Sequence, residues 1–226
     1  MATPKARTAR RLSPPARRRR QRQIEGIRDD ILRSAATAFA RQGYRNSTMQ
    51  EIAAAAGYTA ASLYTYFENK EAIFEALVGM LVEEFFATFA APRSGAFAER
   101  VEALLRAQYE VAEQHSDAFA FLMRMAAGAE PMPERRGKRH PREGNEAFFD
   151  ALSAWMRQNA AATDLKGVDA DEAARVLWGV SYAFIIDWVA RPGSRLVEQA
   201  PRVASFFING VSGGGECELT RNQRGP

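Results

Sequence analysis

The sequence contains one cysteine, Cys217, and two histidines, His115 and His140. A single cysteine excludes an intrachain disulfide and a multi-cysteine metal site. The two histidines lie 25 residues apart, which does not predict a histidine-rich metal site either. We therefore expect no metal and no cofactor.

Long hydrophobic runs are also missing. The longest candidate, residues 85–91, has seven residues and includes Thr88, whereas a helix needs about 20 apolar residues to cross a bilayer. No hydrophobic segment of a signal peptide follows the N-terminal charges. These absences favour a cytoplasmic protein, although an arginine-rich start is also typical of an organelle transit peptide.

Sequence patterns of common enzymes are missing too: there is no phosphate-binding loop, no His-Glu-x-x-His sequence and no nucleophile elbow. Asp169 and Asp171 form a carboxylate pair, but they stand at the start of a predicted helix, where capping and the helix dipole explain them. Cys217 lies in a glycine-rich tail without a nearby histidine. We therefore predict that the chain is not an enzyme.

Positive charge is concentrated at the N-terminus. The 226-residue chain has 31 basic and 27 acidic side chains, and residues 1–22 hold nine of the basic ones and no acidic one. The rest of the chain is thus mildly acidic. Basic tails of this kind typically bind nucleic acid or an anionic membrane. Because residues 1–22 also contain three prolines and few large apolar side chains, we predict a disordered basic arm.

The next part of the sequence predicts two helices. Apolar residues at helical spacing predict a first helix over residues 24–39, which Gly43 ends. Thr48 and Glu51 have the spacing of a capping box at the start of a second, short helix. Gly57 is placed to end that helix in a left-handed conformation.

Two more helices follow closely. Thr59 is expected to cap a third helix over residues 60–66, and Asn69 a fourth helix that runs to Ala91. At 1.5 Å per residue this fourth helix would extend about 33 Å.

Helical periodicity continues to residue 211, and no strand pattern competes with it. The sequence therefore predicts an all-α fold of about nine helices. The remaining predicted elements are helices that begin after Ser94, Ser116 and Asn145, a surface loop over 131–144, helices over 169–190 and about 200–211, the latter with Pro201 in its first turn, and a polar tail from Gly213.

Two short helices joined by a tight glycine-containing turn, after a preceding helix, form a helix-turn-helix unit. In such a unit the second short helix enters the DNA major groove and the first lies across the phosphate backbone. A closer resemblance is carried by Gly43-Tyr44, Thr48, Glu51-Ile52-Ala53, Ala56-Gly57, Ser62-Leu63-Tyr64, Tyr66-Phe67 and Asn69-Lys70-Glu71. These residues closely resemble the N-terminal domain of the TetR family of transcriptional regulators, over about residues 24–75.

The resemblance implies a helix-turn-helix DNA-binding domain over residues 23–75 and a helical ligand-binding and dimerisation domain over residues 76–212. A disordered tail over residues 213–226 would follow. It also implies a homodimeric repressor that binds a pseudo-palindromic operator and is released by a small apolar or aromatic effector. An activator or corepressor-dependent regulator of the same family stays open, as does a protein that binds DNA, or a membrane surface, nonspecifically through its arm.

For the DNA interface, Ile52, Leu63 and Phe67 are expected in the core. The resemblance implies that Tyr64 reaches the DNA while Tyr66 packs. It also implies that Lys70 contacts a phosphate, with a solvated charge as the alternative. The expected DNA-binding residues are Thr48, Gln50, Thr59, Ala60, Ala61, Ser62, Tyr64, Thr65 and Lys70, with Arg18, Arg19, Arg20 and Arg22 in the adjacent minor groove.

Direct base recognition is expected to be thin, because the alanines at 60 and 61 donate no hydrogen bond and can only contact a thymine methyl group. For the arm, the alternative to DNA contact is a flexible solubilising tail.

The second domain is predicted to hold an apolar pocket and a dimer interface. The pocket candidates are aromatic or methionine side chains at helical spacing, a pattern that is also typical of an ordinary core: Phe86, Phe89, Tyr109, Phe119, Met123, Phe148, Trp155, Trp178 and Tyr182. The two C-terminal helices are too apolar for one exposed surface, so pairing with a second copy is expected. The interface candidates are Phe184, Ile185, Trp188, Val203, Phe206 and Phe207. Asp187 is expected to face solvent or the rim of this interface.

Overall fold

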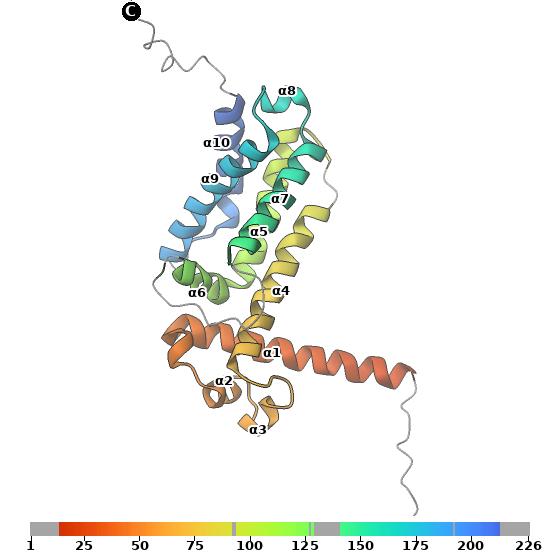
Figure 1. The fold of residues 1–226 in the computed structure, drawn as a ribbon, viewed down its shortest axis with the longest axis vertical. Helices are drawn as coiled ribbons and strands as arrows, with labels where there is room; N and C mark the ends of the chain where they lie inside the picture. The colour runs from red at the N-terminus through yellow and green to blue at the C-terminus, as the bar shows by residue number, and fades with distance from the viewer. Residues whose placement is uncertain (1–13, 92–93, 127, 129–140, 192, 213–226) are drawn as a thin grey trace, which may run out of the picture.

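The computed structural model describes residues 14–91, 94–126, 128, 141–191 and 193–212. Within these ranges the chain forms helices and no strand, which confirms the predicted all-α fold. Figure 1 shows a small unit, made by α2, α3 and the adjoining part of α1, below an elongated bundle of longer helices. The helix α4 begins in the small unit and runs into the bundle.

The described ranges contain ten α-helices and one short 3-10 helix. Their bounds are α1 (Pro14–Asn46), α2 (Met49–Ala55), α3 (Ala60–Leu63), α4 (Lys70–Ala90), α5 (Phe97–Gln114), α6 (Ser116–Ala126), α7 (Pro141–Asn159), α8 (Ala162–Leu165), α9 (Ala170–Ala190), the 3-10 helix (Val197–Gln199) and α10 (Ala200–Ser212).

The first helix starts earlier than the sequence predicted. Residues 14–22, predicted as part of a disordered arm, continue α1 as helix, and residues 1–13 lie outside the described part of the chain. Arginine and glutamine are good helix formers, and prolines are tolerated in a first turn, so this composition does not oppose a helix. The prediction weighed the low apolar content of the segment above its helix propensity.

Other boundaries differ by a few residues. The helix α3 ends at Leu63 rather than Tyr66 and is followed by a turn, and α7 begins at Pro141, inside the predicted loop. The four-residue helix α8 was not predicted. Residues 129–140 and 213–226, which include His140 and Cys217, lie outside the described residues.

The two predicted glycine stops are confirmed by backbone geometry. Gly43 has φ 82° and ψ 162°, and Gly57 has φ 78°. Positive φ values strain residues that carry a Cβ atom, so glycine suits both places. At Gly43 α1 is therefore kinked, and a short helical piece to Asn46 leads towards α2.

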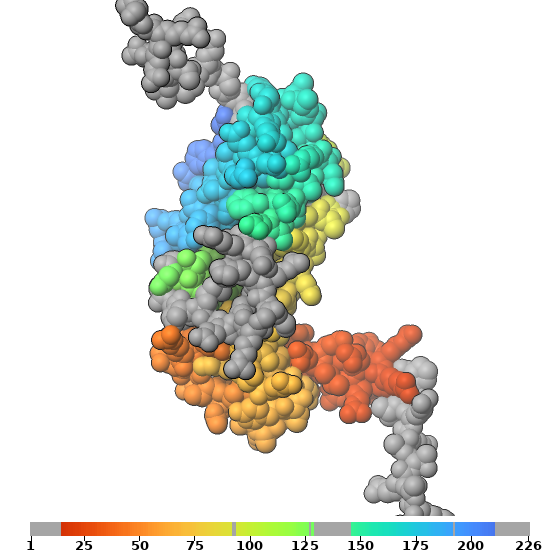
Figure 2. Space-filling model, in the orientation of Figure 1, coloured from red at the N-terminus to blue at the C-terminus, as the bar shows by residue number. Residues whose placement is uncertain are grey.

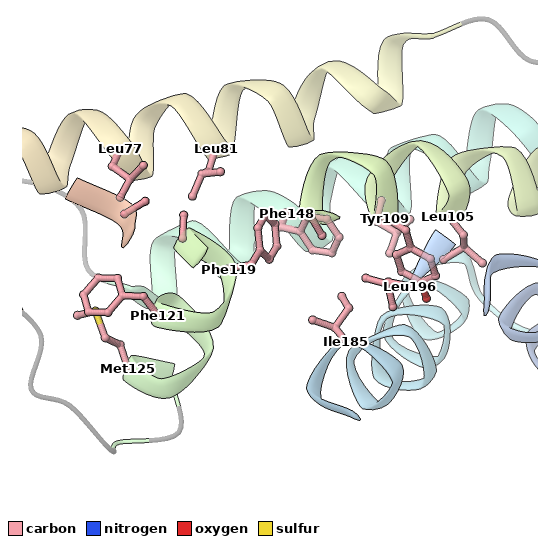
Figure 3. Close-up of a cluster of buried hydrophobic side chains, with 14 of the residues drawn as sticks. Leu77, Leu81, Leu105, Tyr109, Phe119, Phe121, Met125, Phe148, Ile185 and Leu196 are labelled. Carbon is pink, nitrogen blue, oxygen red and sulfur yellow. The ribbon is translucent and has the colours of Figure 1, made fainter. Parts of the chain in front are cut away.

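A single buried core joins both parts of the molecule. Figure 3 shows buried side chains from α4, α5, α6, α7 and α9 following one another along the bundle, from Met125 and Phe121 at one end to Tyr109 and Leu196 at the other. Phe121 packs on Phe39 of α1, with 5.3 Å between the ring centroids. The bundle is therefore packed directly onto the helix that precedes the small unit.

Candidate nucleic-acid interface and its supporting domain

The three N-terminal helices pack around side chains that the sequence placed in the core. Ile52, Leu63 and Phe67 are at most 4% exposed, which confirms this prediction. Burying an apolar side chain of this size stabilises a fold by about 1.5 to 3 kcal/mol. The short helices α2 and α3, which would be marginal alone, are thus held by packing.

The start of α2 is fixed by the predicted capping box. The Glu51 amide donates to Thr48 Oγ1 at 3.2 Å, and the Thr48 amide donates to Glu51 Oε2 at 2.9 Å. Hydrogen bonds from Thr48 lower the pKa of the Glu51 carboxyl: the larger effect comes from the Thr48 hydroxyl and the smaller from the Thr48 amide. Gln50, beside this cap, is exposed.

The start of α3 is capped in the same way. Thr59 Oγ1 accepts a hydrogen bond from the Ser62 amide at 3.2 Å, and Thr65 Oγ1 donates to the Ser62 carbonyl at 2.7 Å. The hydroxyl groups of Thr59 and Thr65, both expected to contact DNA, thus also stabilise the backbone of α3. Ala61 and Thr65 are exposed, whereas Ala60 and Ser62 are half-buried.

Tyr64 and Tyr66 divide as the sequence suggested. Tyr64 is 51% exposed, whereas Tyr66 is half-buried against the core. An exposed tyrosine next to a helix-turn-helix offers an aromatic ring and a hydroxyl to a ligand. Its contact with DNA stays a prediction.

Lys70 was expected either to contact a phosphate or to be a solvated charge, but its side chain binds backbone carbonyls. Its Nζ donates to the carbonyls of Tyr44 at 2.5 Å and Ser47 at 2.6 Å, with Arg45 at 3.3 Å. It also lies 4.4 Å from the centre of the Tyr44 ring. Burial lowers the pKa of the Lys70 ammonium, and the charge of Glu51 opposes that shift.

Lys70 Nζ thus binds carbonyls in the last turn of α1 and at Ser47, just before α2. A fully solvated charge is therefore wrong. The geometry favours Lys70 as the residue that holds the turn before α2, with the phosphate contact still a prediction.

Arg28 is a second cation in this unit, and the sequence did not single it out. Its guanidinium donates to the Tyr66 carbonyl at 2.7 Å and stands 4.1 Å from the centre of the Phe67 ring. It thereby joins α1 to the segment after α3. No sequence signal distinguishes Arg28 from the other arginines around it.

Helix α6 connects the bundle to the end of α1. Arg124 donates to the carbonyls of Phe39 at 3.2 Å and Ala40 at 2.7 Å, and Thr37 donates to Asp117 at 2.6 Å. Phe39 and Ala40 lie just before the kink at Gly43, where a cation complements the dipole of the long helical part of α1. Arg124 therefore stabilises the end of α1 from the bundle side.

Most of the aromatic pocket candidates lie together. Phe148 packs on Trp178 with 4.6 Å between ring centroids and on Phe89 at 5.7 Å. Phe86 packs on Phe89, and Tyr182 on Trp178. Phe119 joins through Phe85, which the sequence prediction missed. We call the set formed by Phe85, Phe86, Phe89, Phe119, Phe148, Trp178 and Tyr182 the aromatic cluster.

Two candidates, Tyr109 and Trp155, contact other residues. Tyr109 is fully buried and pairs its hydroxyl with Ser181 at 3.0 Å, and burial raises its pKa to about 12. Trp155 packs on Phe97 at 6.3 Å. Met123 is half-buried on α6.

Two hollows on the described surface lie away from the aromatic cluster. One of about 300 Å³ follows α5, and one of about 140 Å³ lies among Ala36, Met80 and Asp117 at the junction of α1, α4 and α6. Neither is lined by a pocket candidate.

The C-terminal helices carry an exposed apolar face, but only part of the predicted interface lies on it. Phe206 is 51% exposed and packs beside half-buried Phe184. Ile185, Val203 and Phe207 were wrongly placed in the interface, because they are at most 2% exposed and belong to the core of the same chain. Both faces of these helices are apolar, so the sequence pattern could not tell them apart.

Residues that the sequence prediction missed complete the outer face of α9 and α10. Val176 and Ile186 are exposed apolar side chains, and Gly179 and Ala183 between them leave the backbone accessible. Trp188 is half-buried. Asp187 is exposed and paired with Arg191 at 2.8 Å, as its predicted position in solvent or at the rim requires. By length and composition α9 could also cross a membrane, which is weak evidence, since a core helix of a soluble protein passes the same test.

The capped helices α2 and α3, packed under α1 with an exposed outer surface, define a helix-turn-helix DNA-binding protein. Residues 31–77 match the family model described as bacterial regulatory proteins, tetR family. The chain belongs to the TetR family of transcriptional regulators, as the resemblance implied.

Three proteins illustrate the similarity. The HTH-type transcriptional repressor KstR2 of Mycobacterium tuberculosis is 27% identical over 205 residues, which cover 85% of this chain and 94% of KstR2. The regulator PfmR of Thermus thermophilus matches in structure with a TM-score of 0.65 and 22% identity over 79% of this chain and 97% of PfmR. FadR of Bacillus subtilis, solved with stearoyl-CoA, has a TM-score of 0.60 and 19% identity over 80% and 97% of the two chains.

These relatives are transcriptional regulators, in agreement with the prediction that the chain is not an enzyme.

Proposed function

We propose that the protein is a dimeric repressor that binds a pseudo-palindromic DNA operator through α2 and α3 and leaves it when an apolar ligand enters the bundle. The observation that carries the proposal is the exposed outer surface of the helix-turn-helix, whose neighbouring segments are joined by the hydrogen bonds of Lys70 and Arg28. The relative KstR2 is named as a repressor. The protein would act in the cytoplasm.

On DNA, α3 would lie in the major groove. Thr59, Ala61, Tyr64 and Thr65 present their side chains on its outer side, with half-buried Ala60 and Ser62 beside them. Thr48 and Gln50 at the start of α2 would meet the phosphate backbone, where free helix amides favour an anion. The alanines would contact thymine methyl groups, so Gln50, Thr59, Ser62 and Tyr64 would carry the polar contacts.

Dimerisation would use the outer face of α9 and α10. Phe184, Phe206 and Val176 leave an apolar surface exposed in one chain, and Arg202 lies 5.5 Å from the Phe206 ring centre as a polar rim. A second copy of the same face would cover it and form a four-helix bundle. Two-fold symmetry would then place two α3 helices on successive major-groove faces of the operator.

The ligand would enter at the aromatic cluster. Its rings come from α4, α6, α7 and α9, so a ligand among them would touch four helices at once. FadR binds stearoyl-CoA in its solved complex, and a solved KstR2 structure is titled a ketosteroid transcriptional regulator. We therefore propose an effector with a large apolar body, of the fatty-acyl or steroid type.

Helix α6 and helix α4 would carry ligand occupancy to the DNA-binding unit. Phe119 of α6 belongs to the aromatic cluster, whereas Phe121 and Arg124 of the same helix contact Phe39 at the end of α1. Displacement of Phe119 would thus also move the contacts that hold α1. Such a device requires the ligand to bind one arrangement more tightly than the other.

The test is selection of bound duplexes from a random DNA pool by the purified protein, beside the variant Tyr64→Ala. Enrichment of a palindrome with half-sites about one helical turn apart supports the proposal. The Tyr64→Ala protein should melt at the same temperature and enrich the palindrome weakly. Strong binding without enrichment would instead identify a nonspecific DNA-binding protein. Addition of long-chain acyl-CoA esters and steroids to the selected complex then tests release.

A further inference from the structure

The first part of α1 projects from the body of the protein (Figures 1 and 2). Ile27 packs against the core and Arg28 binds the Tyr66 carbonyl, which joins this part of α1 to the helix-turn-helix. We call residues 14–26, which precede them, the basic extension. At 1.5 Å per residue it is about 20 Å long, the rise of about six base pairs.

The charge of the basic extension calls for an anionic partner. Arg18, Arg19, Arg20 and Arg22 are exposed, and the first acidic residue is Glu25. Arginines in the first turns oppose the helix dipole, and phosphate groups close to them would offset this unfavourable interaction. A duplex held by the neighbouring α2 and α3 would bring such groups close.

The direction of the basic extension decides which part of the duplex it can meet. In Figure 1, α9 and α10 lie on the left of the bundle, and the extension leaves the body to the right. In a dimer joined through α9 and α10 the two extensions would therefore point away from each other. They would reach the duplex outside the two half-sites. This step rests on the proposed dimeric repressor.

Helical phase determines which arginines face the DNA. The helix α1 is regular up to Gly43, so each residue turns by about 100°. Arg20 and Arg17 then lie within about 20° and 40° of the direction of Ile31, which is fully buried in the core. Arg18 and Arg22 lie about 140° and 180° from it. Figure 1 shows α2 and α3 on one side of α1 and α6 on the other, and the proposal requires that Arg17 and Arg20 share the side of α2 and α3.

We propose that the basic extension binds the phosphate backbone of the DNA that flanks each operator half-site, through Arg17 and Arg20. This contact is independent of base sequence. It would lengthen the protected region and raise affinity without changing the preferred sequence. It would also make affinity strongly dependent on salt.

The chain offers a matched pair of variants to test the proposal. Arg17→Gln/Arg20→Gln and Arg18→Gln/Arg22→Gln remove the same charge and introduce the same good helix former. Each full-length protein is titrated with the selected operator, either trimmed to its half-sites or extended by about ten base pairs on each side, from about 50 to about 200 mM salt. Melting temperatures check that both variants fold.

We expect the wild-type protein to bind the extended duplex at least about 10-fold more tightly than the trimmed one at the lower salt concentration. The Arg17→Gln/Arg20→Gln variant should lose this preference, and its salt slope should fall by roughly 3.6 because a dimer loses four phosphate contacts. The Arg18→Gln/Arg22→Gln variant should keep the preference for the extended duplex. All three proteins should prefer the same operator sequence.

Three results would overturn the proposal: equal affinity of the wild-type protein for both duplexes, equal losses in the two variants, or arginine-dependent binding to anionic lipid vesicles without any effect of the flanks. The second result would mean that the charges act without a fixed helical face. A protein that selects no sequence at all would refute the proposed function instead, and this outcome is distinct from a selected operator whose flanks are ignored.

Discussion

Replacement of Lys70 by methionine distinguishes two roles for this residue: holding the turn before α2 and contacting a DNA phosphate. The substitution keeps the length of the side chain and removes the ammonium group. The carbonyls of Tyr44 and Ser47, now 2.5 and 2.6 Å from Nζ, would lose their charged donor. The segment between α1 and α2 would loosen, and the outer surface of α2 and α3 would lose its fixed shape.

The size of the effect follows from these bonds. A hydrogen bond to a charged group contributes about 1.5 to 3 kcal/mol. Because Lys70 is half-buried, water can replace part of the loss, and we expect the free energy of unfolding to fall by about 2 to 3 kcal/mol. For a chain of this length that corresponds to a melting temperature lower by about 5 to 10 °C.

The assay combines thermal unfolding with operator binding below the melting transition of the variant. The positioning role predicts that Lys70→Met loses both stability and DNA affinity. It predicts the same for Lys70→Arg, because a planar guanidinium does not fit three carbonyls arranged around one nitrogen. An unchanged melting temperature with weaker DNA binding would refute this reasoning and identify a phosphate contact.

Three further predictions follow. If the proposed dimer forms through α9 and α10, Phe206→Glu should sediment as a monomer, whereas Val82→Glu, at a similarly exposed position on α4, should sediment as a dimer. Between pH 10 and pH 12 the buried neutral Tyr109 loses its stabilising effect, because its folded pKa of about 12 lies above the unfolded value of 10.0; over this range denaturant titrations should show the wild type losing about 2 to 3 kcal/mol more than Tyr109→Phe. Arg124→Met should lower the free energy of unfolding by about 1 to 2 kcal/mol by removing the donor to the Phe39 and Ala40 carbonyls, and Arg124→Lys should restore part of it. If urea titrations gave Arg124→Met the same free energy of unfolding as the wild type, the last expectation would be contradicted.

Local signals made the small unit predictable. The capping pair Thr48 and Glu51 and the stop at Gly57 each depend on residues within a few positions of one another, so spacing alone determines them. The same holds for the buried face of Ile52 and Leu63, which follows from helical periodicity.

Contacts between distant residues could not be predicted. Lys70 meets carbonyls more than 20 residues away, and Arg124 meets carbonyls more than 80 residues away. Every residue has a backbone carbonyl, so the sequence does not show which carbonyl a distant cation binds. In the sequence, Lys70 and Arg124 therefore look the same as solvated cations. The same reason explains why Arg28 was not predicted.

In the C-terminal helices, the sequence could not predict which apolar face is buried in the same chain. Phe206 and Phe207 are neighbours with the same side chain, yet one is 51% exposed and the other fully buried. A helix that is apolar on two faces needs two partners, and the sequence does not reveal which face meets its own chain. Only the packing of α10 on α5 and α9 resolves this.

The most direct test of the account is the ratio of affinities for the selected operator and for a shuffled duplex of the same composition, at about 150 mM salt. A sequence-specific dimeric regulator predicts a ratio of at least about 1,000, which Tyr64→Ala should reduce strongly at an unchanged melting temperature. A ratio near one, the same for both proteins, would contradict the account, because the outer surface of α3 would then contribute nothing to recognition.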